Sequence, residues 1–285
     1  MVGFEVAADA YDRFMGRYSI QLAPGFADFA GVASGQRVLD VGCGPGALTG
    51  ELVKRLGAKA VSAVDPSESF VAAVGERYRG VDMRHVAAEE LPFADGSFDA
   101  ALAQLVVHHM SDPVRGLVEM ARVTRRGGVV AACVWDHAGG TGPLTAFWQA
   151  ARQLDSDVDD GSELAGTREG HLAELLAEAG LRNVESAVLS VSVEHPSFEE
   201  WWEPFTLGVG LPGAYVLGLD EARRAELRER CREVLPTAPF KLTARAWTAR
   251  GFRQSCRSLD VRGRRAHVLA AGSIHPSGKQ GGLQR

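Results

Sequence analysis

The chain has 285 residues, of which 46% are hydrophobic and 24% charged, a balance typical of soluble globular proteins. No apolar run approaches the roughly 20 residues that a membrane-spanning helix needs. Four widely separated cysteines (Cys43, Cys133, Cys231 and Cys256) form no C-x-x-C pair, which argues against a zinc site or a disulfide framework.

The net charge of −5 is unevenly distributed. Residues 250–285 carry eight of the 31 Lys and Arg residues but only one of the 36 acids, Asp260, so the rest of the chain is strongly acidic. Because an acidic body repels polyanions, we expect no nucleic-acid partner, and without an apolar span we expect no membrane partner. Acids such as Glu5 and Asp9 stand where a secretory signal has a basic start and an apolar stretch, so we expect a cytoplasmic protein.

Apolar runs alternate with segments of helical periodicity between residues 36 and 135. This pattern predicts βαβ units and a Rossmann-like three-layer sandwich around a mostly parallel sheet. The predicted strands are residues 37–42, 60–64, 81–87, 98–106 and 128–135. The predicted helices are residues 47–56, 67–79, with Ser67 as N-cap, and 113–124.

The alternation loosens after Trp135. Helices are predicted at 171–179 and 220–234, and strands at 184–193 and 240–247. An insertion before the last strand concentrates four aromatic residues, Trp201, Trp202, Phe205 and Tyr215. These could line a pocket for a flat or apolar molecule, or they could be core.

The central feature is the segment Val-Leu-Asp-Val-Gly-Cys-Gly-Pro-Gly-Ala at residues 38–47, where a strand enters a glycine turn and a helix leaves it. Glycine permits positive φ and lets a ligand lie against the backbone. The spacing also fits the dinucleotide fingerprint, with Gly42, Gly44 and Ala47 at its small positions. The glycines alone therefore leave both NAD and S-adenosylmethionine open.

An acidic residue lies near the carboxyl end of each of the first two predicted strands. The Asp40 carboxylate would repel a pyrophosphate by up to about 4 kcal/mol at ~4 Å in an effective dielectric of about 20, whereas it would attract an ammonium and a sulfonium. The alternative is a buried aspartate that holds the turn. Asp65 can accept the ribose hydroxyls of an adenosine, and its alternative role is a helix N-cap before Pro66.

The motifs form an ordered series. Val38–Thr49 and Ala63–Ser67 resemble the first and second motifs of class I S-adenosylmethionine-dependent methyltransferases. Residues 91–99, Leu-Pro-Phe-Ala-Asp-Gly-Ser-Phe-Asp, are similar to a segment of the small-molecule, ubiquinone-biosynthesis-like subgroup. Gln104–His109 and Val123–Gly128 resemble the fourth-strand motif and the turn before the fifth strand.

The resemblance implies a methyltransferase domain over residues 1–250, with a seven-stranded sheet whose last strand is antiparallel. Within it, residues 1–35 would form cap helices, 36–135 the cofactor-binding half and 194–238 a substrate lid. Residues 251–285 would be a disordered basic tail.

The resemblance also implies how S-adenosylmethionine is bound. The glycine turn and Gln104 would lie near the methionine, with Tyr11 and Arg17 over its carboxylate. One departure is Ala87, which stands where the subgroup has an Asp that bonds the adenine. The implied cofactor-binding residues are Tyr11, Arg17, Asp40, Gly42, Cys43, Gly44, Gly46, Asp65, Pro66, Ser67, Ala88, Glu89 and Gln104.

His108 and His109 end the fourth predicted strand, beside the expected methyl position. Either could act as a base toward a hydroxyl or an acidic carbon, and neutral hydrogen bonding is the alternative. A metal site would need further ligands, for which His137 is poorly spaced, so we expect no metal.

The favoured function is S-adenosylmethionine-dependent methyl transfer to a small organic acceptor. An NAD-dependent oxidoreductase is the first alternative, opposed by Asp40 and by residues 91–99. A non-catalytic cofactor-binding protein is the second, supported by Ala87.

Overall fold

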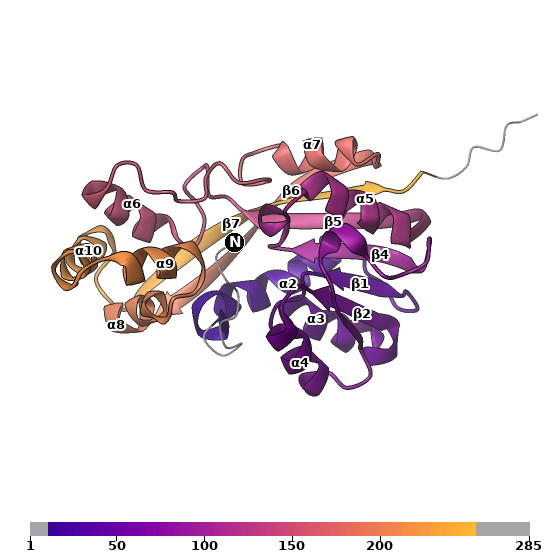
Figure 1. The fold of residues 1–285 in the computed structure, drawn as a ribbon, viewed down its shortest axis with the longest axis horizontal. Coiled ribbons are helices and arrows are strands. Elements are labelled where there is room, and N and C mark those ends of the chain that lie inside the picture. The colour runs from indigo at the N-terminus through magenta and orange to yellow at the C-terminus, as the bar shows by residue number, and fades with distance from the viewer. Residues whose placement is uncertain (1–10, 255–285) are drawn as a thin grey trace, which may run out of the picture. The chain divides into compact units, whose positions relative to one another are not determined.

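A computed structural model describes residues 11–254. Its centre is a seven-stranded sheet with the strand order β3-β2-β1-β4-β5-β7-β6 (Figure 1). The first five strands in this order are parallel, and β7 is antiparallel to both β5 and β6. The predicted Rossmann-like sheet with an antiparallel last strand is confirmed. The strands are β1 (Val38–Val41), β2 (Val61–Asp65), β3 (Asp82–His85), β4 (Phe98–Gln104), β5 (Thr124–Trp135), β6 (Arg182–His195) and β7 (Phe240–Phe252).

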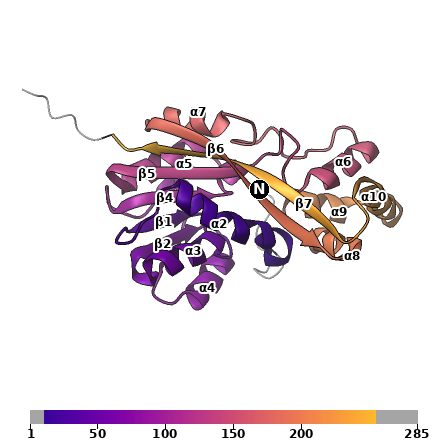
Figure 2. The same ribbon diagram turned by 180° about the vertical axis from the view of Figure 1, so that it is seen from behind.

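Helices cover both faces of this sheet (Figures 1 and 2). One face carries α2 (Arg17–Phe29), α3 (Ala47–Leu56) and α4 (Glu68–Arg77), and the other carries α5 (Pro113–Val123) and α7 (His171–Glu178). Ser67 is the N-cap of α4, as predicted, and its side chain accepts a hydrogen bond from the Phe70 amide.

The two layers of helices bury alternate residues of the same strands. Along β1, Val38 belongs to the apolar core that contains Leu48 of α3, whereas Leu39 belongs to the core that contains Leu117 of α5. Successive side chains of a strand point to opposite faces, so both faces of a covered parallel sheet need apolar residues. This explains why the early strands read as continuous apolar runs.

The strand order reverses between β1 and β4. β1 pairs with β2 on one side and with β4 on the other, so the connections leave their carboxyl ends toward opposite faces. Such a switch point leaves a crevice outside the strand ends, where ligands bind in sheets of this type.

The second half of the chain adds helices that the sequence only partly predicts. The helix α6 (Thr145–Leu154) was not predicted, although its buried Phe147, Trp148, Ala150 and Ala151 follow helical spacing. Between β6 and β7 the chain forms α8 (Phe198–Trp202), a 3₁₀ segment η5 (Glu203–Leu207), α9 (Gly210–Gly218) and α10 (Glu221–Val234).

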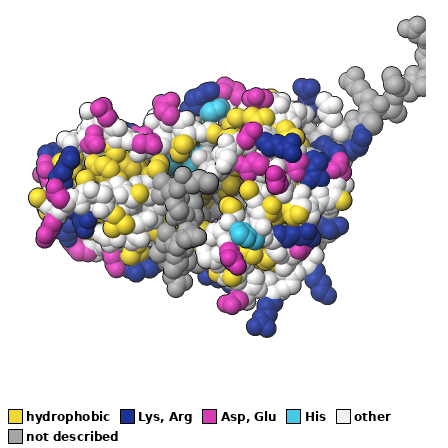
Figure 3. Space-filling view, viewed as in Figure 1, with side chains coloured by type: hydrophobic (Ala, Val, Ile, Leu, Met, Phe, Trp, Pro, Cys, Tyr) yellow, Lys and Arg dark blue, Asp and Glu magenta, His cyan; other side chains and the backbone are white. Residues whose placement is uncertain are grey.

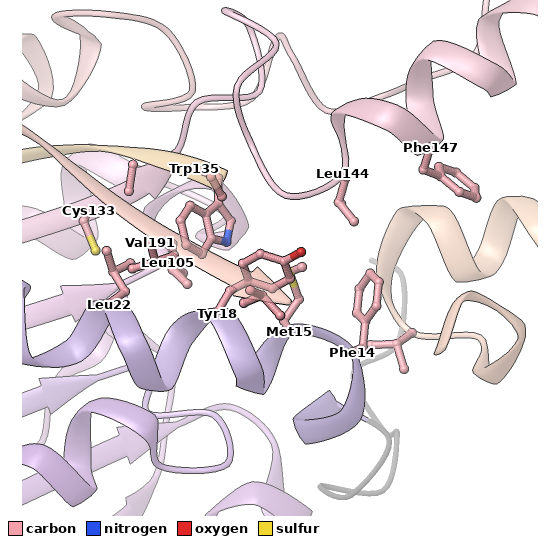
Figure 4. Packing of buried hydrophobic residues seen from close by; sticks show 14 of the residues in the cluster. Phe14, Met15, Tyr18, Leu22, Leu105, Cys133, Trp135, Leu144, Phe147 and Val191 are labelled. Atoms are coloured by element: carbon pink, nitrogen blue, oxygen red, sulfur yellow. The ribbon is translucent and has the colours of Figure 1, made fainter. Parts of the chain in front are cut away.

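The aromatic residues of this insertion are mostly core. Trp201, Trp202 and Phe205 are 4%, 7% and 3% exposed. The Phe205 ring stacks on Phe147 of α6 at 4.6 Å between centroids, and Figure 4 shows Phe147 beside Leu144 and Phe14 in the same cluster. Of the two possible roles, the core role is the one observed for Trp201 and Trp202, which attach the insertion to the sheet domain.

The ordered chain extends past the predicted domain end at residue 250. β7 continues to Phe252, and the Arg253 guanidinium donates to the carbonyl oxygens of Arg122 and Thr124. The first four residues of the predicted tail, 251–254, therefore belong to the folded chain, and the rest of that prediction falls on residues 255–285, outside the described part of the chain. Within residues 11–254, no helix is long and apolar enough to cross a membrane.

Replacing the core residue Trp202 with Ala is expected to lower the free energy of unfolding by about 3–5 kcal/mol, because a buried aromatic ring leaves a cavity. Urea denaturation measures this loss. The control is Leu217→Ala on α9, where the side chain is 57% exposed and Figure 3 shows hydrophobic side chains gathered at the surface around α9. Its effect should stay within about 0.5 kcal/mol. Equal effects of the two substitutions would contradict a core role for Trp202.

Candidate active site

A cavity opens at the carboxyl ends of β1, β2 and β4, at the switch point of the sheet. We call it the glycine-turn cavity. It is lined by Tyr11, Ser19, Asp40, Gly42, Cys43, Gly44, Pro45, Ala47, Leu48, Asp65, Pro66, Phe70, Gln104, Leu105, Val106 and His109.

The glycine turn brings bare backbone to this cavity. Gly42 has a φ of +71°, and a Cβ on it would lie 2.5 Å from the methyl groups of Val106, so only glycine fits. Gly44 has a φ of +51° and open space beside it, which leaves its backbone accessible to a ligand. The turn is held from below, because the amides of Gly42 and Cys43 both donate to the Val64 carbonyl at 2.8 and 3.0 Å.

Asp40 is the dominant electrostatic feature of the cavity. It is 1% exposed, and the Thr49 hydroxyl of α3 donates to its Oδ2 at 2.6 Å. Its Oδ1 is buried and has no hydrogen-bond partner among the described residues. Burial raises the pKa of Asp40 to about 7, and the nearby Asp65 carboxylate adds to the rise. The carboxylate therefore has an acceptor oxygen and a charge that only a bound donor or cation can satisfy.

Asp65 supports the turn while facing the cavity. Its Oδ2 accepts the Gly44 amide and its Oδ1 accepts the Ser67 amide, both at 2.8 Å. It is not the N-cap of α4, since Ser67 fills that position. Burial raises the pKa of Asp65, and the two amides act in the opposite direction. The carboxylate keeps lone pairs beyond these two bonds, so a ribose role stays open.

Gln104, at the end of β4, connects that strand with α2 at the cavity. Its Nε2 donates to the Ser19 carbonyl at 3.1 Å, and its buried Oε1 has no partner among the described residues. The next residue, Leu105, has a φ of +62°, which is strained for a branched side chain. Its amide donates to Cys133 of β5 at 2.9 Å, which holds the strained residue beside the cavity.

Several predicted cofactor residues lie elsewhere. Gly46 is the left-handed N-cap residue of α3, and a Cβ on it would press on Tyr78 and Val74 at 3.1 Å. Ser67 caps α4. Ala88 is buried in the core, and the Glu89 carboxylate accepts the Asp112 amide at 3.2 Å. None of the four lines the glycine-turn cavity, so their predicted contacts with the cofactor are not supported by the structure.

Arg17 was expected over the methionine carboxylate, but it is not among the residues that line the glycine-turn cavity. Its guanidinium forms an ion pair with Glu200 of α8 and lies 3.2 Å from Nδ1 of His195. The Tyr18 hydroxyl lies 3.1 Å from the other nitrogen of this ring. These contacts connect α2 with the insertion between β6 and β7. A local sequence motif could not predict them, because the partners are far apart in the sequence.

Phe70 and Ser19 also line the glycine-turn cavity, although the sequence motifs did not predict them. Phe70 begins the apolar face of α4, and its ring meets the Tyr11 ring edge-on at 5.8 Å between centroids. Its position three residues after Ser67, at the start of the helix that leaves the strand end, was the available signal. Ser19 contributes through its backbone contact with Gln104, which no side-chain pattern could reveal.

A second cavity adjoins the first. We call it the histidine cavity. Tyr11, Leu105 and His109 line both cavities. The remaining lining residues of the histidine cavity are Phe14, Met15, His108, Trp135, Leu144, Trp148, Asp160, Gly161, Leu164, Val209, Gly210, Leu211 and Pro212 together with His137. Figure 4 shows part of this wall, with Phe14 and Met15 on one side and Leu144 and Trp135 on another.

Three histidine rings gather in this second cavity. The His108 and His109 rings are 3.8 Å apart, and the His137 ring lies 6.0 Å from His108. Burial lowers the pKa of His108 strongly and that of His137 to about 4, and repulsion from the neighbouring rings lowers the pKa of His108 further. The pKa of His109, whose side chain is exposed, shifts in the same direction. At neutral pH the His108 and His137 rings are therefore uncharged.

Comparison with known proteins agrees with this architecture. Residues 39–132 match the family described as a methyltransferase domain. The ubiquinone/menaquinone biosynthesis C-methyltransferase UbiE of Bdellovibrio bacteriovorus is 39% identical over 106 residues, which cover 36% of this chain and 45% of that protein. The chain thus spans less than half the length of this curated relative, and the resemblance to small-molecule class I methyltransferases is confirmed for the matched segment.

Solved structures extend the similarity of fold over most of the chain. A proposed methyltransferase of Bacillus halodurans superposes with a TM-score of 0.55 at 17% identity, covering 82% of this chain and 99% of that one. A phospholethanolamine N-methyltransferase 2 of Haemonchus contortus, in complex with phosphomonomethylethanolamine and S-adenosylhomocysteine, gives 0.52 at 17% identity, covering 87% and 60%. At these identities the superpositions establish the fold.

Asp40→Asn is expected to stabilise the ligand-free protein above neutral pH. A carboxyl whose pKa is raised on folding holds its proton more tightly in the folded state, so stability falls as pH rises from about 4 to about 7. Removing the charge should restore up to roughly 4 kcal/mol at pH 8 and nothing below about pH 4. Urea unfolding at several pH values measures this.

The matched control is Asp99→Asn, because Arg125 holds the pKa of Asp99 below its usual range and that substitution should destabilise at pH 8. A loss of stability in Asp40→Asn at pH 8 would show that the carboxylate is satisfied without a ligand.

Asp65→Ala should lower stability by about 1–3 kcal/mol, since two backbone amides lose their acceptor. Thermal and urea unfolding without ligand detect the loss. The comparison is Asp82→Ala in β3, whose exposed carboxylate pairs with Arg84 at the surface and should matter little. Unchanged stability in Asp65→Ala would mean that the turn is held by other contacts.

Proposed function

We propose that this chain, which resembles the class I methyltransferases in its motifs, its sheet and its matched segment, transfers a methyl group from S-adenosylmethionine to a small organic acceptor. The carrying observation is the pair of buried oxygens, Asp40 Oδ1 and Gln104 Oε1, that lie at the glycine-turn cavity without hydrogen-bond partners in the described structure. Two unsatisfied acceptors, one of them an acid, suit a cationic donor such as an α-ammonium.

The lining residues suit the rest of this cofactor. Asp65 would accept ribose hydroxyls while it continues to hold the Gly44 amide. Tyr11 and Phe70 would contribute aromatic surface at the same cavity. When bound, S-adenosylmethionine supplies a methyl group made electrophilic by its sulfonium. The chain supplies the negative end of the cavity and the bare glycine backbone against which the cofactor packs.

Charge favours this cofactor over a dinucleotide. The glycines suit either ligand, but a pyrophosphate beside Asp40 and Asp65 would meet two carboxylates. No Lys or Arg is among the residues that line the glycine-turn cavity in the described structure, so nothing there would offset that repulsion. The family match of residues 39–132 favours methyl transfer on independent grounds.

The acceptor would occupy the histidine cavity. Tyr11, Leu105 and His109 stand where the two cavities meet, so a methyl group passing from one to the other must pass them. Holding the two reactants in line supplies much of the rate enhancement in such a reaction. His109 is the candidate catalytic base there, and His108 lies further into the second cavity. The inserted residues that would act as a substrate lid are those from Val209 to Pro212.

The expected setting is a cytoplasmic enzyme with a small-molecule partner. The residues that line the histidine cavity come from elements that pack into one core with the sheet. The proposed cofactor and acceptor sites would therefore belong to the same folded unit.

Calorimetry should show that S-adenosylmethionine and S-adenosylhomocysteine bind while NAD does not. Asp40→Asn should weaken binding of both adenosyl compounds by at least about tenfold, because the charged partner of the ammonium is lost. Asp99→Asn, at the other end of the sheet, should leave the affinity unchanged. Tight NAD binding with no response to S-adenosylhomocysteine would overturn the proposal.

The protonation of Asp40 offers a second readout from the same titrations. At about pH 6 the free carboxyl is mostly protonated, and binding of a cation should expel that proton. Wild-type protein should therefore show a binding enthalpy that varies with the ionisation enthalpy of the buffer, and Asp40→Asn should not. A buffer-independent wild-type enthalpy would place the ammonium away from Asp40.

A further inference from the structure

The histidine cavity has a chemical character that constrains its ligand. Its walls are largely apolar, with Phe14, Leu144 and Leu211 among them, and two tryptophans, Trp135 and Trp148, add flat surface. Such walls favour a compact molecule with an apolar body.

Charge is nearly absent from these walls. No Lys or Arg is among the lining residues in the described structure, and the single acid, Asp160, already forms an ion pair with Arg152. The His108 and His137 imidazoles are neutral at physiological pH because burial disfavours their charged forms. A ligand carrying a carboxylate or a phosphate would lose its hydration here and gain no counter-charge, which costs several kcal/mol per ion.

Two polar atoms in this cavity wall lack partners. His108 Nδ1 and Trp148 Nε1 are buried and make no hydrogen bond within the described residues. The indole N–H is only a donor, so it requires an acceptor atom on a ligand. A neutral imidazole has one nitrogen that accepts and one that donates, and the unpartnered Nδ1 can accept from a ligand in one of its two tautomers. Buried polar groups left in this way are costly, so they indicate ligand contacts.

We infer that the methyl acceptor of this chain is an uncharged, largely apolar molecule that presents a hydrogen-bond donor to His108 and an acceptor atom to Trp148. The inference rests on the proposed function and deepens it by naming the class of acceptor. His108 and Trp148 are its specificity-determining residues, distinct from His109, which lies at the boundary of the two cavities.

Three probes of one shape test this selection on the full chain saturated with S-adenosylhomocysteine. Methyl 4-hydroxyphenylacetate is uncharged and has both a donor and acceptor oxygens. Its free acid, 4-hydroxyphenylacetate, adds a negative charge, and methyl 4-methoxyphenylacetate lacks the donor. Binding at about pH 7.5 is followed by calorimetry and by the intrinsic fluorescence of the protein, to which Trp135 and Trp148 in the cavity wall contribute.

The neutral hydroxy ester should bind at least about tenfold more tightly than the acid, and several-fold more tightly than the methoxy ester. Equal or tighter binding of the acid would overturn the inference, as would equal affinity of the two esters. Failure of the hydroxy ester to bind at millimolar concentration would overturn it as well. None of these outcomes bears on cofactor binding, and the proposed function is overturned separately, if S-adenosylhomocysteine itself does not bind.

A pair of variants tests whether Trp148 contacts the ligand. Trp148→Phe keeps an aromatic ring and removes the N–H, so it should weaken the hydroxy ester by about three- to tenfold and leave S-adenosylhomocysteine affinity unchanged. Trp202→Phe is the matched control, since Trp202 is as buried as Trp148 but does not line the cavity. Equal affinities in both variants would exclude Trp148 as a ligand contact, and the probe comparison on unaltered protein stands even if a variant fails to fold.

Discussion

The buried carboxylate of Asp40 is the constraint on which the site depends. Placing a charged group at 1% exposure is unfavourable unless something compensates it, and Thr49 compensates only one of its two oxygens. The sheet can hold such a residue because β1 lies in its centre, where neighbouring strands and helices fix the backbone. The folded protein thus retains an unsatisfied acceptor at the point where the strand order reverses, and a cationic ligand removes that cost on binding.

Around this carboxylate, each neighbouring element is fixed by a contact that also shapes the cavity. The Asp65 side chain holds the Gly44 amide, so the second strand determines the conformation of the glycine turn. The Gln104 amide group holds the Ser19 carbonyl, so the fourth strand positions α2 over the opening. Strain at Leu105 belongs to the same pattern, since its φ of +62° is maintained by a hydrogen bond to Cys133. The same few side chains therefore hold these elements in place and line the cavity.

Features encoded locally were predicted well from the sequence. Strand periodicity, the glycine turn and the Ser67 cap each depend on neighbours within a few residues, and all three appear where expected. Arg17 could not be placed in this way, because its nearer partner in the sequence, His195, is 178 residues away and Glu200 is further still. The same limit applies to Trp201 and Trp202, since apolar aromatic residues are equally suited to a core and to a pocket wall. Only the three-dimensional packing of α6 against the insertion decides between them.

The two cavities differ in how far the sequence predicts them. The glycine-turn cavity is built from segments next to one another in the sheet. Its acidic residues and glycines occur in motifs that can be recognised in the sequence. The histidine cavity is assembled from η1 (Asp12–Gly16), the ends of β4 and β5, α6 and the start of α9, elements that share no motif. The selectivity inferred for it depends on the near absence of fixed charge from its walls and on two polar atoms that are left unpaired among the described residues. An insertion can therefore change the acceptor of such a fold while the cofactor half stays the same, because only the second cavity depends on it.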